Sequence, residues 1–139
     1  MGTVKKPIGY WLKRLDAALE VHLDRTLAVA GLSRRQWQTL NTLADGPLRP
    51  DALDERLRPF WGGDVQLRER ELAALIRHGL VGMLDGNILL SEDGHRKRQE
   101  ALRIVEEARR DLTAGIGHDE YAIALGVLER MCANAERLV

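Results

Sequence analysis

The sequence predicts a mostly α-helical protein with one short two-stranded β-hairpin. Apolar residues recur at spacings of three and four through most of the chain, which is the periodicity of a helix with one buried face. Asp85-Gly86 lies between two apolar runs, 80–84 and 87–90, and such a dipeptide is typical of a hairpin turn. Leu, Ala, Arg and Glu are abundant while aromatic residues make up only 4%, and this composition favours helices.

The composition limits the class of protein. A chain of 139 residues is the size of one domain, and 21 basic against 21 acidic side chains exclude a polycation or an acidic tail. No apolar run reaches the roughly 18 residues of a membrane span, and residues 1–7 lack the apolar stretch of a signal peptide. The single Cys132 permits no internal disulfide, and we expect it to be an inert, partly buried thiol. These features predict a cytoplasmic protein with no membrane partner.

The N-terminal half predicts three helices. Residues 8–30 carry one apolar stripe that ends at Gly31, and Ser33-Arg34-Arg35-Gln36 reads as a capping box that begins a second, short helix. Pro50 suits a first helical turn, so a third helix is expected over about 51–58, broken by Pro59 and by Gly62-Gly63.

A fourth helix is predicted over about 64–78, followed by the hairpin. Its inner side is expected to carry four apolar residues: Val65, Leu72, Leu75 and Ile76. Its outward row, at i, i+4, i+7 and i+11, carries Gln66, Arg70, Ala73 and Arg77. Two long helices follow, over about 92–114 and 118–138.

Three helices followed by a hairpin are the order of a winged helix-turn-helix, here over 33–90. The flanking segments, 1–32 and 91–139, have apolar stripes and no other evident role, so we interpret them as dimerisation helices. The whole chain, 1–139, is then a single domain, and a two-fold dimer would set two recognition helices about 34 Å apart, one turn of DNA.

The sequence resembles the MarR-type transcriptional regulators over nearly its whole length. The matching stretches, in the family's order, are 31–40, 72–81, Leu90-Ser91-Glu92-Asp93-Gly94, 119–121 and 128–131. The resemblance implies a homodimer that binds double-stranded DNA at a palindromic operator, usually as a repressor. It also implies release by a small effector, often aromatic, or by oxidation. We expect no cofactor.

Five residues are candidates for DNA contact. Arg70 falls where the resemblance implies a DNA-contacting arginine, and a guanidinium can pair with guanine through two hydrogen bonds. Gln66 on the same row could read adenine, and Arg77 is expected to meet a phosphate. Arg34 and Arg35 begin a helix whose backbone N–H groups could hold a phosphate. For each of these residues a solvated helix face is the plainer interpretation.

An effector pocket is expected where the dimerisation helices meet the DNA-binding lobe. Trp11, Trp37 and Trp61 fall in segments that could line it, and Arg14 could pair with an anionic effector. The simpler interpretation makes Trp11 and Trp37 core anchors. The sequence contains no catalytic motif and no metal-ligand spacing, so we expect neither an enzyme nor a metal site.

Two departures from the family's pattern leave a second function open. The hairpin has Asp85 but no Arg or Lys, whereas the family's wings are usually longer and carry an Asp-x-Arg element. Glu69 and Glu71 flank Arg70, and residues 31–90 carry eight basic and eight acidic side chains. The alternative is therefore a dimeric small-molecule-binding or protein-interaction module that has lost DNA binding.

Overall fold

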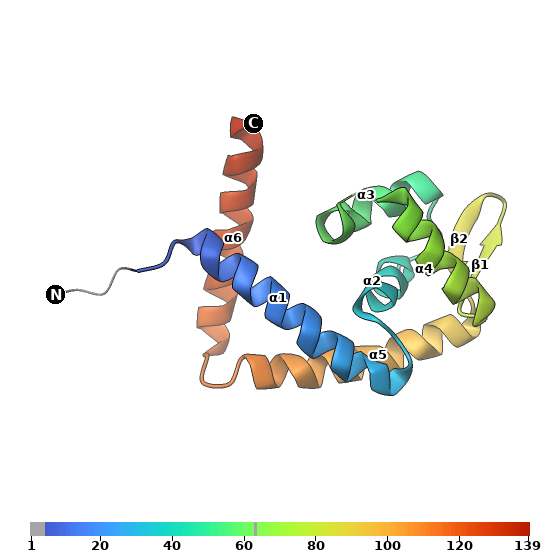
Figure 1. The fold of residues 1–139 in the computed structure, drawn as a ribbon, viewed down its shortest axis with the longest axis horizontal. Coiled ribbons are helices and arrows are strands. Elements are labelled where there is room, and N and C mark those ends of the chain that lie inside the picture. The colour runs from blue at the N-terminus through green and yellow to red at the C-terminus, as the bar shows by residue number, and fades with distance from the viewer. Residues whose placement is uncertain (1–4, 63) are drawn as a thin grey trace. The chain divides into compact units, whose positions relative to one another are not determined.

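A computed structural model describes residues 5–62 and 64–139. This part of the chain contains six α-helices and one two-stranded β-hairpin, which follows the fourth helix along the chain, and this confirms the predicted fold class (Figure 1). The elements are α1 (Ile8–Leu27), a 3₁₀ turn (Ala28–Ala30), α2 (Arg34–Leu43), α3 (Pro50–Trp61), α4 (Val65–Arg77), β1 (Val81–Leu84), β2 (Asn87–Leu90), α5 (Glu92–Leu112) and α6 (His118–Leu138).

The contacts divide the chain into two compact units, one up to Glu106 and one from Glu107 onward. The boundary lies within α5, so the first unit contains the three-helix segment, the hairpin and α1. Among the described helices, none combines the length and apolarity needed to cross a membrane.

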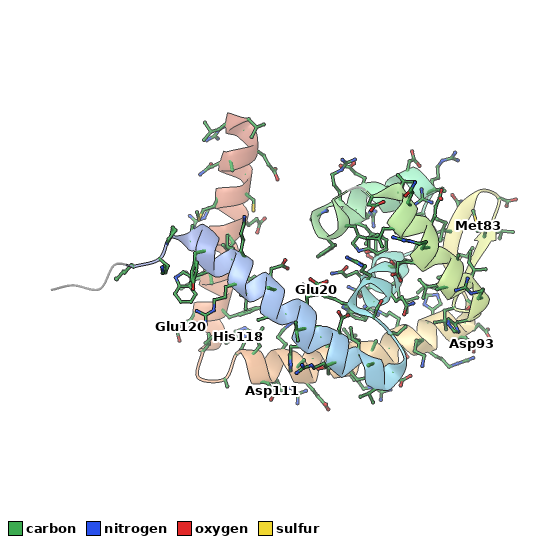
Figure 2. The ribbon with its side chains drawn as sticks, in the orientation of Figure 1. Glu20, Met83, Asp93, Asp111, His118 and Glu120 are labelled. Carbon is green, nitrogen blue, oxygen red and sulfur yellow. The ribbon has the colours of Figure 1, made fainter. Side chains whose placement is uncertain are left out.

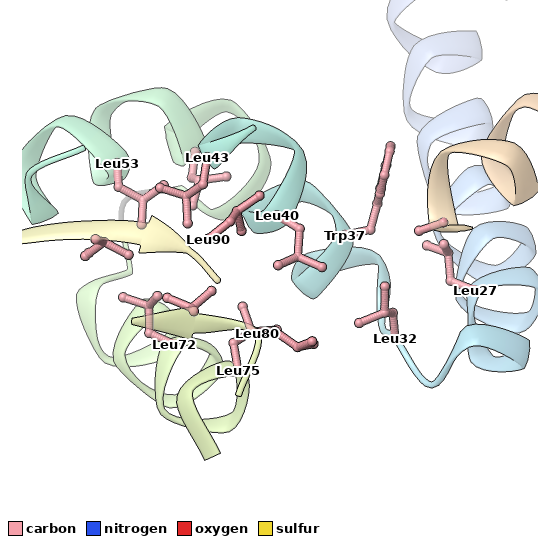
Figure 3. Packing of buried hydrophobic residues seen from close by; sticks show 14 of the residues in the cluster. Leu27, Leu32, Trp37, Leu40, Leu43, Leu53, Leu72, Leu75, Leu80 and Leu90 are labelled. Atoms are coloured by element: carbon pink, nitrogen blue, oxygen red, sulfur yellow. The ribbon is translucent and has the colours of Figure 1, made fainter. Parts of the chain in front are cut away.

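Leucines form most of the core of the first unit. Figure 3 shows side chains from α2, α3, α4 and both strands meeting there. Leu40, Leu53 and Leu75, one from each helix, are fully buried. Ala101 of α5 is also fully buried, so the N-terminal part of α5 belongs to this lobe. Helices α2, α3 and α4 and the wing are thus held together as one body by a shared core.

The start of α2 follows the sequence prediction closely. The Ser33 side chain accepts from the Gln36 N–H at 3.1 Å, and the Gln36 side chain accepts from the Ser33 N–H at 3.1 Å. This capping box satisfies two amide groups that the first turn of a helix leaves without partners.

The end of α3 differs from the prediction, because the helix does not stop at Arg58. It continues through Pro59 to Trp61 and ends at Gly62, whose φ is +65°. Proline this late removes a single backbone hydrogen bond from the helix. Trp61 compensates, since its ring is buried and its indole N–H donates to Gln38 Oε1 of α2 at 3.0 Å.

The wing is short and regular. β1 pairs with β2 antiparallel, Val81 opposite Leu90, and Asp85 and Gly86 both have positive φ, 52° and 79°. This is the geometry of the tight turn that Asp-Gly predicts. Leu48 adds a bridge to Ile88 through N–H···O bonds of 2.9 and 2.7 Å, an extra pairing that the sequence did not indicate.

Three further expectations about burial were wrong. On α4, Leu72 and Leu75 are buried, but Val65 and Ile76 are 46% and 44% exposed, because only the middle of the apolar face is covered. Trp11 is not a core anchor, since it is 52% exposed. Cys132 is exposed rather than partly buried.

Candidate nucleic-acid interface

Helix α4 presents the row that the sequence predicts for DNA contact. Gln66, Arg70 and Arg77 are all exposed, as is Ala73 between them. At 1.5 Å per residue the row from position 66 to 77 is about 16 Å long, which suits a major groove read by one helix. Asp64 accepts from the Leu67 N–H at 3.1 Å and thereby caps α4.

A salt bridge that sequence reasoning missed fixes this helix. Arg68 Nε donates to Asp54 Oδ1 at 2.6 Å, and Arg68 Nη2 donates to Asp54 Oδ2 at 3.0 Å. The two side chains are only 15% and 22% exposed. The hydrogen bond to Asp54 raises the pKa of Arg68 above its usual value. Two parallel bonds from a planar guanidinium set the orientation of α4 on α3, so Arg68 positions the row without belonging to it.

Acidic and apolar groups lie close to the same surface. Glu69 is exposed beside Arg70, and Glu71 is partly buried on the other side. Met83, labelled in Figure 2, and Leu84 are 58% and 62% exposed on the wing. The wing carries no Lys or Arg, so any electrostatic attraction of a phosphate backbone falls to the helices.

Arg34 and Arg35 do not join the α4 row. The Arg34 backbone N–H donates to Asp24 Oδ1 at 2.7 Å, and the Arg34 side-chain Nη2 lies 3.4 Å from Asp16 Oδ1. This backbone N–H is therefore occupied by a carboxylate of α1. Both arginines line a groove of about 170 Å³ to which α1, α2, α3 and α4 all contribute, together with four carboxylates: Asp16, Glu20, Asp24 and Glu71.

The four residues predicted to line an effector pocket fall into two separate groups. Trp11 packs edge-on against Tyr10, with ring centroids 5.1 Å apart, and the Arg14 guanidinium carbon lies 5.5 Å from the Trp11 ring centroid. Trp37 and Trp61 are both 8% exposed and belong to the leucine core. Among the described residues no cluster of His, Cys, Asp and Glu could hold a metal ion.

Solved structures with this fold include transcriptional regulators. The chain is 28% identical to the transcriptional regulator PA3341, covering 94% of this chain and 99% of that one, with a TM-score of 0.81. It is 22% identical to the MarR family protein Rv2887 of Mycobacterium tuberculosis in complex with DNA, covering 91% and 98%, TM-score 0.76. It is 20% identical to CouR from Rhodococcus jostii RHA1 bound to p-coumaroyl-CoA, covering 94% and 95%, TM-score 0.80.

These neighbours confirm the resemblance to MarR-type regulators over nearly the full length of the chain. The fold is that of a family of regulators rather than enzymes, in agreement with the expectation from the sequence. No family model matches the sequence, and no curated protein matches it either.

Proposed function

We propose that this chain, which has the winged-helix fold of MarR-family transcriptional regulators, is a homodimeric DNA-binding repressor that responds to a small effector. The observation that carries the proposal is the exposed row Gln66, Arg70 and Arg77 on a helix fixed by the Arg68–Asp54 bridge. One neighbour is bound to DNA and another to an acyl-coenzyme A, so the fold accommodates both kinds of partner.

Binding to a palindrome is tested directly by fluorescence anisotropy. The probe is the duplex upstream of the protein's own gene, with a scrambled duplex of equal length as the control, titrated across salt. We expect selective binding that weakens as salt rises, because each neutralised phosphate contributes about 0.9 to the slope of log K against log salt. Equal, weak binding to both duplexes would favour the alternative module, which the absence of Lys and Arg from the wing and the presence of Glu69 beside Arg70 also support.

Dimerisation rests on apolar side chains that each unit leaves exposed. On α1, Ile8, Leu12 and Leu15 are 46%, 43% and 47% exposed. Helix α6 buries none of its residues, and Leu125 and Met131 are 50% and 41% exposed. Exposed apolar surface of this extent on two helices favours burial against a second copy of the chain over exposure to water.

The double variant Leu12→Glu, Leu15→Glu is expected to be monomeric at micromolar concentration while keeping its helical circular dichroism. Two carboxylates on an apolar interface lose their hydration without gaining partners. Sedimentation velocity measures the change, and Lys13→Glu, an exposed charged position on the same helix, serves as the control. A double variant that sediments like the wild type would show that α1 is not in the interface.

A further inference from the structure

Glu69 is an exposed acidic side chain at the edge of the outward row of α4. With 3.6 residues per turn, it lies about 60° around the helix from Gln66 and about 40° from Ala73. Ala73, one turn further along, carries only a methyl group, so no long side chain at i+4 covers the Glu69 carboxylate. Glu69 therefore reaches the same surface as the row, on the side opposite to Arg70.

The Glu69 carboxylate keeps its hydrogen-bonding capacity for a partner outside the chain. Within the part of the chain that the structure describes, neither an ion pair nor a side-chain hydrogen bond includes it. The guanidinium adjacent in sequence is turned away, because Arg68 donates to Asp54 through Nε and Nη2. An ionised carboxylate accepts hydrogen bonds and donates none, so its partner must be a donor.

The major groove of DNA offers such a donor on one base in particular. Cytosine presents its N4 amino group there, and a carboxylate is the side-chain group that matches it. Thymine O4 and the O6 and N7 atoms of guanine are acceptors, which a carboxylate repels. Adenine places an acceptor, N7, beside its N6 amino group and so fits less well. A carboxylate at the base edges therefore favours cytosine.

We propose that Glu69 is a specificity-determining residue that accepts a hydrogen bond from the N4 amino group of a cytosine in each half-site of the DNA. Arg70, on the other side of the row, would read a guanine at a fixed separation from that cytosine. The inference rests on the proposed function, because it requires α4 to lie in the major groove. A carboxylate beside phosphates weakens binding to every sequence, whereas one at the base edges disfavours only sequences without the cytosine.

The test selects binding sites for the full chain from a random duplex library, with the wild type and with Glu69→Gln, and sequences the bound DNA. We expect the wild type to enrich a cytosine at one position of each half-site. Glu69→Gln should lose this preference in favour of adenine, which pairs with a glutamine amide, and should keep the wild-type preference at every other position. The variant should fold normally, since Glu69 is exposed.

Fluorescence anisotropy gives the size of the effect, with the selected duplex and a copy in which that C·G pair is T·A. The exchange places thymine O4 against the carboxylate, so the wild type should lose at least about fivefold in affinity. Glu69→Gln should lose less, because its amide can donate to O4. Glu71→Gln is the matched control. It removes the same charge from the same helix, but Glu71 is partly buried and lines the groove shared by α1, α2, α3 and α4.

The possible outcomes distinguish base reading from repulsion. Glu71→Gln should select the same bases as the wild type. If Glu69→Gln also selects the same bases and only binds all duplexes more tightly, the assignment is overturned and Glu69 is a repulsive charge. An identical loss of the cytosine in both variants would overturn it too, because the effect would not be local. A wild type that enriches no sequence would refute the proposed repressor itself, and this inference with it.

Discussion

Arg70→Ala is expected to abolish most of the sequence selectivity of DNA binding while leaving the thermal unfolding temperature unchanged. A guanidinium that pairs with guanine through two hydrogen bonds contributes about 1–3 kcal/mol of discrimination, or roughly 5- to 150-fold. A homodimer would lose the contact twice. Arg70 is exposed, so its removal costs the folded lobe little. Anisotropy with the upstream duplex and its scrambled control measures the change.

Arg77→Ala separates a base contact from a phosphate contact on the same row. We expect it to weaken binding to both duplexes alike and to lower the salt slope by about one per lost phosphate contact. Arg70→Ala should instead bring the two duplexes closer together in affinity. If Arg70→Ala keeps the wild-type preference for the upstream duplex, α4 does not read bases through this residue.

The elements that could be predicted from the sequence are those set by local chemistry. The Ser33 capping box, the Asp85-Gly86 turn and the start of α6 each depend on a few adjacent residues, and all three were confirmed. The predicted end of α3 was wrong because the residue that holds the last turn in place is distant in sequence. Trp61 holds the last turn of α3 through a hydrogen bond to Gln38, 23 residues earlier, and this contact outweighs the tendency of Pro59 to end the helix.

The exposed row of the candidate site could be predicted from periodicity, but the contacts that hold α4 in place could not. Periodicity shows which residues share a face of α4, and it does not show that Arg68 is turned toward Asp54 of α3. Arg34 was assigned to a phosphate because it begins a helix. The same free N–H attracts any nearby carboxylate, and the fold supplies Asp24, ten residues earlier. The groove lined by Arg34 and Arg35 could not be predicted either, because its lining comes from four helices and no single helix carries its pattern.

Gly94 allows a close approach between α5 and the backbone of Leu80, which follows α4. The Ser91 N–H donates to the Leu80 carbonyl at 3.1 Å, and the Gly94 N–H donates to Ser91 Oγ at 3.0 Å, so Ser91 caps α5 against Leu80. A Cβ on Gly94 would collide with the Leu80 carbonyl oxygen and lie 3.0 Å from its carbon. Backbone atoms cannot turn aside as a flexible side chain can, so α5 must move.

Gly94→Ala is therefore expected to lower the free energy of unfolding by about 3 kcal/mol or more, in spite of the better helix propensity of alanine. For a chain of this size that corresponds to a loss of about 10 °C in Tm, measured by circular dichroism. Gly82→Ala in β1 is the matched control, because a Cβ there meets nothing within 4 Å, and its Tm should stay unchanged or rise slightly. A Gly94→Ala protein as stable as Gly82→Ala would mean that α5 does not approach Leu80 this closely.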